Sequence, residues 1–230
     1  MPTFGGIVVP TGAEASGRRT LLDVVDELAR PVDASDTTIR ALAADAFRAA
    51  VRTMNRKGCW PWEYQEEDVA ITANVRFSSV TSAIKKPLSM HLLDAAAGTE
   101  DQRISYVPYD VFREQYTLDI DSDPLRYTIP NLFETGQIRW FPRPSAADNA
   151  RFAFWRVTPA PRAEQETIEV PDYAVEVYTA LAWAEFLKRL PTRQQPFPIV
   201  VALAEARQAF KEMSAHVNSP GDRSRERMAG

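Results

Sequence analysis

Hydrophobic and polar residues follow a helical period at both ends of the chain and alternate like strands in between. Between residues 20 and 58 the apolar positions recur at steps of three and four, the spacing of one buried helix face. From 64 to 170, short alternating runs are separated by prolines, and helical spacing returns from 173 to 217. The pattern predicts an α+β fold: a helical bundle built from the N- and C-terminal helices, with an inserted antiparallel β region.

The first helical segment contains two expected helices with clear start signals. Thr20 is a good N-cap, and Asp23, three residues later, completes a capping box. The second helix is predicted to begin at Ser35 or Asp36. Its buried stripe is expected to consist of Ile39, Leu42, Ala43, Ala46, Phe47, Ala50 and Met54.

The middle region is predicted to consist of short strands. Residues 69–72 and 75–77 flank Ala73-Asn74, which predicts a hairpin. A short helix is expected over 108–116, because proline is tolerated in a first helical turn. Further strands are predicted at 88–93, 104–107, 126–129, 137–141 and 151–157.

Two more helices are expected at the end of the chain. The segment 173–190 is apolar nearly all round, which predicts a central helix buried on several sides. The last helix has a narrow seam suited to antiparallel packing on it, formed by Ile199, Leu203, Ala206, Phe210, Met213 and Val217. We therefore expect a flexible arm over 1–19, a single domain over 20–217 and a flexible tail over 218–230.

Composition narrows the class of function. The chain of 230 residues carries a net charge of −4, which argues against a dedicated nucleic-acid clamp but not against DNA passing nearby. A single cysteine, Cys59, excludes an internal disulfide and fits a reducing compartment; it is expected to be a small buried residue. No apolar run approaches the length of a membrane span, so we expect no membrane partner and synthesis in the cytoplasm.

Motifs for catalysis or ligand binding are incomplete. The segment from Gly12 to Thr20 has the glycine spacing of a phosphate-binding loop, but Arg18 replaces the lysine. Asp119 to Asp123 begins like a calcium loop, although Pro124 stands where glycine is required. One cysteine and two distant histidines do not form a zinc motif. We therefore expect no catalytic residue, cofactor or metal ion, and interpret these segments as a flexible arm and a solvated turn.

Three features are candidates for partner contacts. Trp60 and Trp62 flank a proline, so in an extended segment they would point to opposite sides; one is expected in the core, and Trp62 is the candidate for an interface. Glu63, Glu66, Glu67 and Asp68 are expected in a solvated loop, which in a ring could line the lumen. The C-terminal tail is either a disordered end or a strap that docks on a partner through Arg223, Arg225 and Arg227.

A series of short motifs between residues 20 and 215 gives the chain a resemblance to a known family. The motifs, in order, are Thr20 to Asp23, Trp60 to Trp62, Lys86 to Leu88, Val111 to Tyr116, Arg126 to Ile129, Gly136 to Pro144, Phe154 to Pro159 and Ile168 to Tyr173. This order resembles the head-to-tail adaptor, or connector, proteins of tailed bacteriophages.

The resemblance implies a structural virion protein of the neck, made in the host cytoplasm. It implies a homo-oligomeric ring beneath the portal, typically a dodecamer, which extends the DNA channel and docks the tail or a stopper or nozzle protein. DNA would pass through the lumen without sequence-specific binding, and a terminal segment such as the arginine-bearing tail would insert into the portal. Two alternatives stay open: another virion component, such as a tail terminator or fibre module, and a nucleotide hydrolase using the Gly12 to Thr20 segment.

Overall fold

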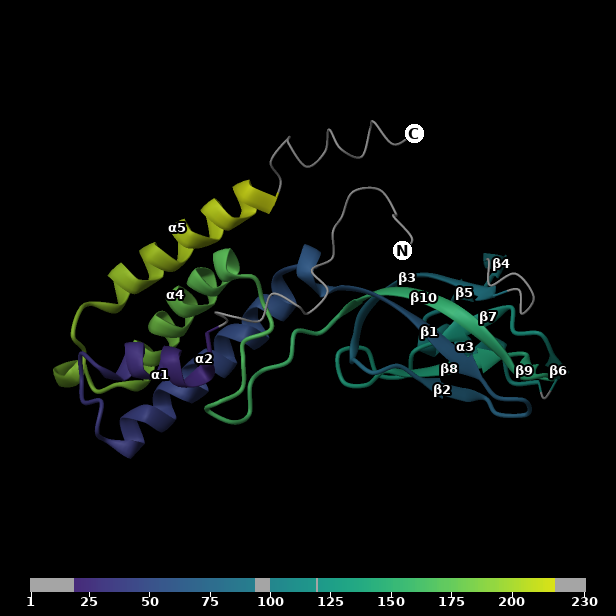
Figure 1. Ribbon diagram of the computed structural model, residues 1–230, viewed down its shortest axis with the longest axis horizontal. Coiled ribbons are helices and arrows are strands. Elements are labelled where there is room, and N and C mark those ends of the chain that lie inside the picture. The colour runs from purple at the N-terminus through teal and green to yellow at the C-terminus, as the bar shows by residue number, and fades with distance from the viewer. Residues whose placement is uncertain (1–18, 94–99, 119, 218–230) are drawn as a thin grey trace. The chain divides into compact units, whose positions relative to one another are not determined.

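The chain folds into two compact units, which are described separately (Figure 1). A computed structural model describes residues 19–93, 100–118 and 120–217. The helical unit comprises residues 1–58 and 158–230, and the β unit comprises residues 59–157. The five α-helices of the described residues, together with mainly antiparallel sheets, confirm a mixed α+β fold.

Both predicted N-terminal helices form, and both are capped as expected. Helix α1 (Leu21–Ala29) begins at Thr20, whose backbone N–H donates to Asp23 at 2.7 Å while Asp23 N–H donates to the Thr20 hydroxyl oxygen at 3.3 Å. Helix α2 (Thr37–Lys57) is capped by Asp36, which accepts the N–H of Thr38 at 2.7 Å. The predicted stripe of α2 is buried except for Leu42, which is half-buried.

The C-terminal helices complete the helical unit. Helix α4 (Asp172–Arg189) packs against α1, α2 and α5 (Ile199–Val217), and a 3₁₀ turn, η2 (Thr192–Gln194), precedes α5. The contacts of α4 with three helices confirm that it is central, and Figure 1 shows it between α2 and α5. Along the predicted seam of α5, Ala206 and Met213 are buried and the other members are half-buried.

The segment 158–171 contacts the helices of the helical unit. The side-chain amide of Asn55 donates to the Thr158 carbonyl at 2.9 Å and accepts the Thr158 N–H at 3.0 Å. The Arg48 guanidinium donates to the carbonyls of Pro161 and Arg162 at 3.0 and 2.7 Å. Although the sequence pattern grouped this segment with the strands, its hydrogen bonds connect it to α2. The organisation of 20–217 as a single domain stays a prediction.

The β unit contains two four-stranded sheets and one two-stranded sheet, with strand orders β1-β10-β3-β4, β2-β8-β7-β5 and β6-β9. Its elements are η1 (Pro61–Glu63), β1 (Tyr64–Ile71), β2 (Phe77–Ser79), β3 (Ile84–Leu93), β4 (Glu100–Arg103), β5 (Ser105–Tyr106), α3 (Tyr109–Gln115), β6 (Asp121–Ser122), β7 (Arg126–Thr128), β8 (Gln137–Phe141), β9 (Arg143–Pro144) and β10 (Asp148–Arg156). The five strands predicted from 88 onwards and the short helix are confirmed within a few residues.

The hairpin predicted around Ala73-Asn74 is wrong, although the chain does turn there. Asn74 adopts a φ of 61°, and the N–H of Val75 donates to the Thr72 carbonyl at 3.1 Å. Strand β1, however, pairs along its whole length with β10, while β2 pairs with β8 in the other large sheet. The turn therefore carries the chain from one large sheet to the other. Strands β1 and β2 each pair more favourably with a strand that is distant in sequence than with each other.

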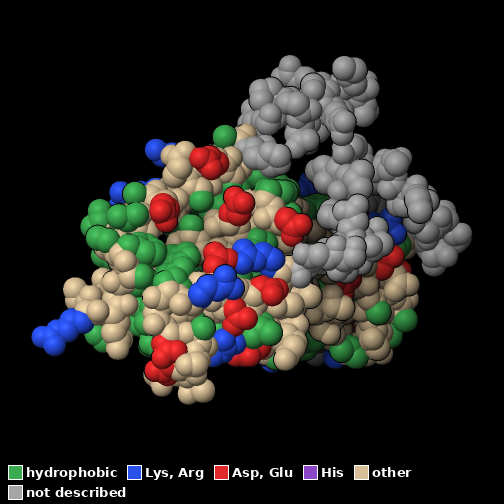
Figure 2. Space-filling model, turned by 60° about the vertical axis from the view of Figure 1, so that its left-hand side comes forward, with side chains coloured by type: hydrophobic (Ala, Val, Ile, Leu, Met, Phe, Trp, Pro, Cys, Tyr) green, Lys and Arg blue, Asp and Glu red, His purple; other side chains and the backbone are tan. Residues whose placement is uncertain are grey.

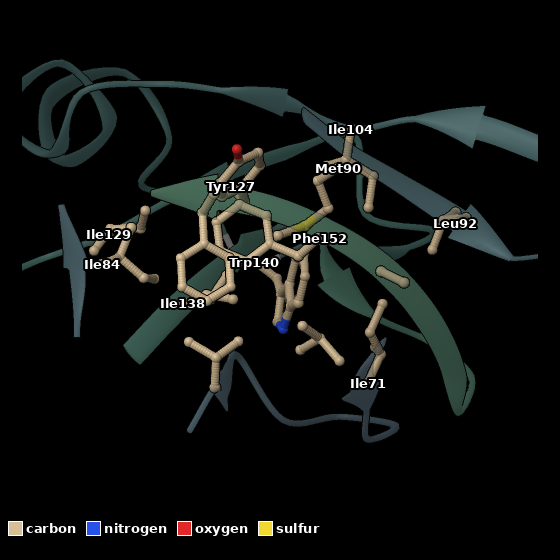
Figure 3. Close-up of a cluster of buried hydrophobic side chains, with 14 residues drawn as sticks. Ile71, Ile84, Met90, Leu92, Ile104, Tyr127, Ile129, Ile138, Trp140 and Phe152 are labelled. Carbon is tan, nitrogen blue, oxygen red and sulfur yellow. The ribbon is translucent and has the colours of Figure 1, made fainter. Parts of the chain in front are cut away.

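The core of the β unit lies between its two large sheets (Figure 3). Side chains of both sheets meet there, as expected for sheets packed face to face. The indole N–H of Trp140 donates to the Ser78 hydroxyl at 3.0 Å, which satisfies the one polar atom of this large buried side chain. The buried cluster consists of Val69, Ile71, Val80, Ile84, Met90, Leu92, Ile104, Tyr127, Ile129, Ile138, Trp140, Ala150, Phe152 and Phe154.

Candidate interaction surfaces

The two tryptophans at the start of the β unit lie against each other. The rings of Trp60 and Trp62 are stacked, with centroids 5.6 Å apart and planes inclined by 7°. The prediction that they point to opposite sides is wrong, because Pro61 begins a 3₁₀ turn in place of an extended segment. Trp60 is buried and Trp62 is half-buried. A role of Trp62 at a subunit interface stays a prediction.

A buried ion pair follows directly after the tryptophans. The Glu63 carboxylate accepts the Lys85 ammonium at 2.7 Å and the Trp60 backbone N–H at 3.0 Å. The side chains of Glu63 and Lys85 are 0% and 4% exposed. The expectation that Glu63 is solvated is therefore wrong. The pair joins the tryptophan turn to β3, and removing either member would break a buried ion pair.

The rest of the acidic run lies on strand β1, not in a loop as predicted. Glu67 accepts the backbone N–H of Thr81 at 3.0 Å and its hydroxyl at 2.8 Å. Asp68 accepts two bonds from the Arg151 guanidinium on β10, at 3.0 and 3.3 Å. Glu66 is exposed. Two of these acids therefore have roles within the β unit, and a position in a ring lumen stays a prediction.

The segment that begins like a calcium loop uses its central acid for an ion pair. Asp119 lies outside the described residues. Asp121 binds the guanidinium of Arg143 through both carboxylate oxygens, at 2.5 and 2.8 Å, and this contact holds the pKa of the Asp121 carboxyl below its ordinary value. Throughout the described ranges, no group of three or more His, Cys, Asp or Glu is arranged to hold a metal ion.

The segment that resembles a phosphate-binding loop is described only at its end. Residues 12–18 lie outside the described ranges. The hydroxyl of Thr20, which would face a metal ion in such a loop, donates to Asp23 at 2.8 Å and caps α1. Arg19 pairs with Glu27 of α1. The described residues therefore fit the interpretation as a helix start.

Cys59 and the two histidines are the remaining reactive side chains that the sequence brought into question. Cys59 is exposed, so the expectation that it is buried is wrong; it lies directly before the tryptophan turn and not in the core. His91 lies on β3, while the side chain of His216 is outside the described part of the chain. Within the parts of the chain that are described, no helix combines the length and apolar character needed to span a membrane.

The helical unit presents two features to solvent that could meet a partner. Val200 and Val201, in the first turn of α5, are 71% and 44% exposed. Arg52 and Arg56 are exposed near the C-terminal end of α2, where the Lys57 ammonium lies 4.5 Å from the centre of the Phe210 ring. Figure 2, which brings the helical unit forward, shows hydrophobic side chains gathered beside mixed acidic and basic ones. The sequence pattern did not identify the exposed valines, because helical spacing does not show whether an apolar helix face is covered by neighbouring elements or partly exposed to solvent.

The predicted docking strap cannot be placed on these surfaces. Arg223, Arg225 and Arg227 lie outside the described residues. Their role in partner binding stays a prediction.

The buried Lys85 was missed by the sequence analysis, and no signal could have found it, since a lysine inside an alternating strand is normally exposed.

Comparison with known proteins assigns the chain to a described family. The family model of the SU10 adaptor protein matches residues 19–229. The match includes the whole β unit and nearly all of the helical unit. No curated protein matches the chain.

Proposed function

This chain belongs to the SU10 adaptor protein family, and we infer from that membership how it assembles in the virion. The family is one of bacteriophage structural adaptors and not of enzymes. An adaptor of this kind lies in the virion neck and interacts with portal and tail components. The match over residues 19–229 carries the proposal that follows.

We propose that copies of the chain form a closed ring beneath the portal, a dodecamer whose lumen continues the DNA channel. A head-to-tail interface closes into a ring when the rotation per subunit divides a full turn. The net charge of −4 supports passage of DNA without retention, because a wall that is neutral or acidic does not bind phosphate strongly. The lower face of the ring docks the tail or a stopper protein.

Exposed valines of the helical unit contribute to the contact between neighbouring copies in this proposal. Val200 is 71% exposed although it is a large apolar side chain, and Val201 beside it is 44% exposed. Apolar side chains at the centre of a permanent interface are removed from water, and such interfaces bury on the order of 2,000 Å² or more. Trp62 is assigned to the same class of contact, and Arg223, Arg225 and Arg227 to contacts with the portal.

Native mass spectrometry and electron microscopy of the protein, alone and with its portal, test this proposal. A closed ring, formed either alone or only on the portal, is the expected result. A monomer that does not bind portal under any condition would contradict it. Binding to the portal also distinguishes this proposal from the alternatives, since a tail terminator or a fibre module would bind the tail and not the portal. The symmetry of the ring is a second distinction.

A pair of variants tests the proposed contact between copies. Val200→Asp places a charge in the interface and should abolish ring formation, while the exposed position leaves the protomer folded. Ala215→Asp is the matched control on the same helix, since Ala215 is also exposed. Equal ring formation by both variants would exclude Val200 from the interface.

A further inference from the structure

The helical unit carries a group of exposed cations where the end of α2 meets α5. The Lys57 ammonium lies 4.5 Å from the centre of the Phe210 ring, which places the two helices side by side there. Arg207 lies one turn before Phe210 on the same side of α5, and Arg52 lies one turn before Arg56 on α2. The group, which we name the basic α2–α5 surface, consists of Arg52, Arg56, Lys57, Arg207 and Lys211, all of them exposed.

These five cations differ from other cations of the helical unit in having no acidic partner. Arg40 and Arg48, for example, form ion pairs with Asp26 and Asp45. No described residue forms an ion pair with any member of the basic α2–α5 surface. The two ends of the chain outside the described ranges carry more cations than acids, with Arg18, Arg223, Arg225 and Arg227 against Glu14, Asp222 and Glu226.

The two acids of α5 lie on a different side of the helix from its two cations. At about 100° per residue, Arg207 is turned about 160° from Glu205, and Lys211 is turned about 100° from Glu212. The Glu212 carboxylate accepts the side-chain amide of Gln208 at 2.6 Å. The positive charge of the basic α2–α5 surface is therefore not neutralised along its own helix.

The spacing of these cations is unfavourable in the free protein. Arg52 and Arg56 are four residues apart, as are Arg207 and Lys211, and like charges at this spacing repel each other on a helix. The helix dipole favours cations in the last turn, which accounts for Arg56 and Lys57. It does not account for Arg52, Arg207 and Lys211, which lie more than a turn from a helix end. An anion bound across both pairs would relieve the repulsion.

We propose that the basic α2–α5 surface contacts the phosphate backbone of DNA in the channel. Its charge selects an anionic partner, and arginine and lysine side chains are sufficient to bind phosphates. A protein partner would require apolar anchors at the centre of the contact. Among the described residues, however, no large exposed hydrophobic residue lies on α2, and those of α5, Val200 and Val201, are in its first turn. The inference rests on the proposed adaptor function, and it adds which surface of each copy meets the DNA.

A contact of this kind is weak enough to let the DNA move. Non-specific binding through phosphates gives dissociation constants on the order of 10⁻⁴ to 10⁻⁶ M, and it carries no sequence information. The helical unit as a whole contains as many acidic as basic residues, and the net charge of −4 belongs to the β unit. The basic α2–α5 surface therefore meets the DNA locally, while the rest of the chain does not retain it.

A labelled DNA duplex of arbitrary sequence provides the probe, and its fluorescence anisotropy is measured with the full-length protein at several salt concentrations. Duplexes of different sequence should bind equally, and log K should fall with log salt at a slope of about −4. The double variant Arg207→Gln/Lys211→Gln should bind about tenfold more weakly, with a slope shallower by about 2. The matched control Arg189→Gln/Arg193→Gln removes the same charge from exposed positions on α4 and η2, and it should bind like the wild type.

The same variants separate this inference from the proposed function. Ring formation and portal binding should be unchanged in both double variants, and far-UV circular dichroism should show that both are folded. If the wild type does not bind the duplex, or if the two double variants lose binding equally, the DNA contact is refuted while the adaptor function stands. Loss of portal or tail binding by Arg207→Gln/Lys211→Gln, with DNA binding intact, would also refute it and assign the surface to an acidic protein. Failure of the wild type to bind the portal would refute the adaptor function itself.

Discussion

An ion pair of the helical unit and one of the β unit differ in how deeply they are buried. In the helical unit, the pair Lys188–Glu185 lies at the surface, with side chains 46% and 30% exposed. In the β unit, Glu63 and Lys85 are both removed from solvent and lie 2.7 Å apart. Exposed apolar residues are also distributed unequally, since seven of the ten large ones among the described residues belong to the β unit.

The two units differ in whether nearby or distant residues of the sequence determine their structures. Residues a few positions apart determine the helices α1 and α2 of the helical unit, through their caps and their buried faces. The β unit depends on contacts between distant segments, and it leaves more apolar surface for a partner. Single substitutions should therefore have their largest effects in the β unit. Four of the five tryptophans lie there, so fluorescence reports on its unfolding while circular dichroism reports on the helices.

Lys85→Met should be the most destabilising change. The buried Glu63 carboxylate would lose the ammonium that lies 2.7 Å from it, and breaking such a pair costs about 3–5 kcal/mol of the free energy of unfolding. Urea denaturation followed by tryptophan fluorescence measures the loss. Lys188→Met is the control in the helical unit, where an exposed pair contributes less than about 1 kcal/mol. Equal losses in the two variants would remove the contrast between the units.

Gly136→Ala should cost about 3 kcal/mol, since it overpacks a site closed by backbone atoms. A Cβ at Gly136 would lie 2.6 Å from the carbonyl oxygens of both Val80 and Ser82. The N–H of Val80 already donates to the Gly136 carbonyl at 2.9 Å, so the two segments cannot separate without losing this bond. Gly58→Ala is the control, because the φ of Gly58 is 175°, which any residue adopts. A Gly136→Ala protein with the wild-type urea midpoint would contradict the close approach.

The sequence was sufficient to predict α1, α2, α4 and α5 of the helical unit. Thr20 and Asp23 mark the start of α1, and the apolar period of α2 indicates its length and buried face. The segment 173–190, apolar nearly all round, indicates the length of α4. These features depend on residues only a few positions apart, so the local sequence is enough to indicate them. The link between Asn55 and Thr158 could not be predicted, because it joins residues about a hundred positions apart.

The β unit could be predicted as strands but not as a topology. Alternation located β3, β8 and β10, yet it cannot say which strands pair, and the nearest partner was wrong for β1 and β2. The surroundings of the candidate site residues could not be predicted for the same reason. Nothing near Glu63 in sequence indicates that Lys85 will neutralise it, and nothing near Arg139 places it between Phe77 and Phe112.

Asn55→Ala tests a long-range contact of the helical unit, which is the kind of contact on which the β unit depends. The change removes both hydrogen bonds between the Asn55 amide and the backbone of the buried Thr158. A loss of about 2 kcal/mol is expected. Thermal unfolding followed by circular dichroism measures it. Arg52→Ala, at an exposed position one turn earlier on α2, should leave the midpoint unchanged, and a comparable effect of both changes would show that the link contributes nothing specific.

The smallest effect is expected at the purely local feature, the capping box of α1. Thr20→Ala removes the hydroxyl that accepts the Asp23 N–H and donates to its carboxylate, and should cost about 1 kcal/mol, whereas Thr20→Ser should be nearly neutral. The Thr20 backbone N–H, followed by its hydroxyl, holds the pKa of the Asp23 carboxyl below its ordinary value. Because the folded pKa is the lower one, this contribution to stability is present above about pH 4 and disappears as the pH falls through the folded pKa. The stability difference between wild type and Asp23→Asn should therefore shrink in acid. A difference that stays constant from neutral pH down to about pH 2 would show that the carboxylate form of Asp23 is not what closes the box.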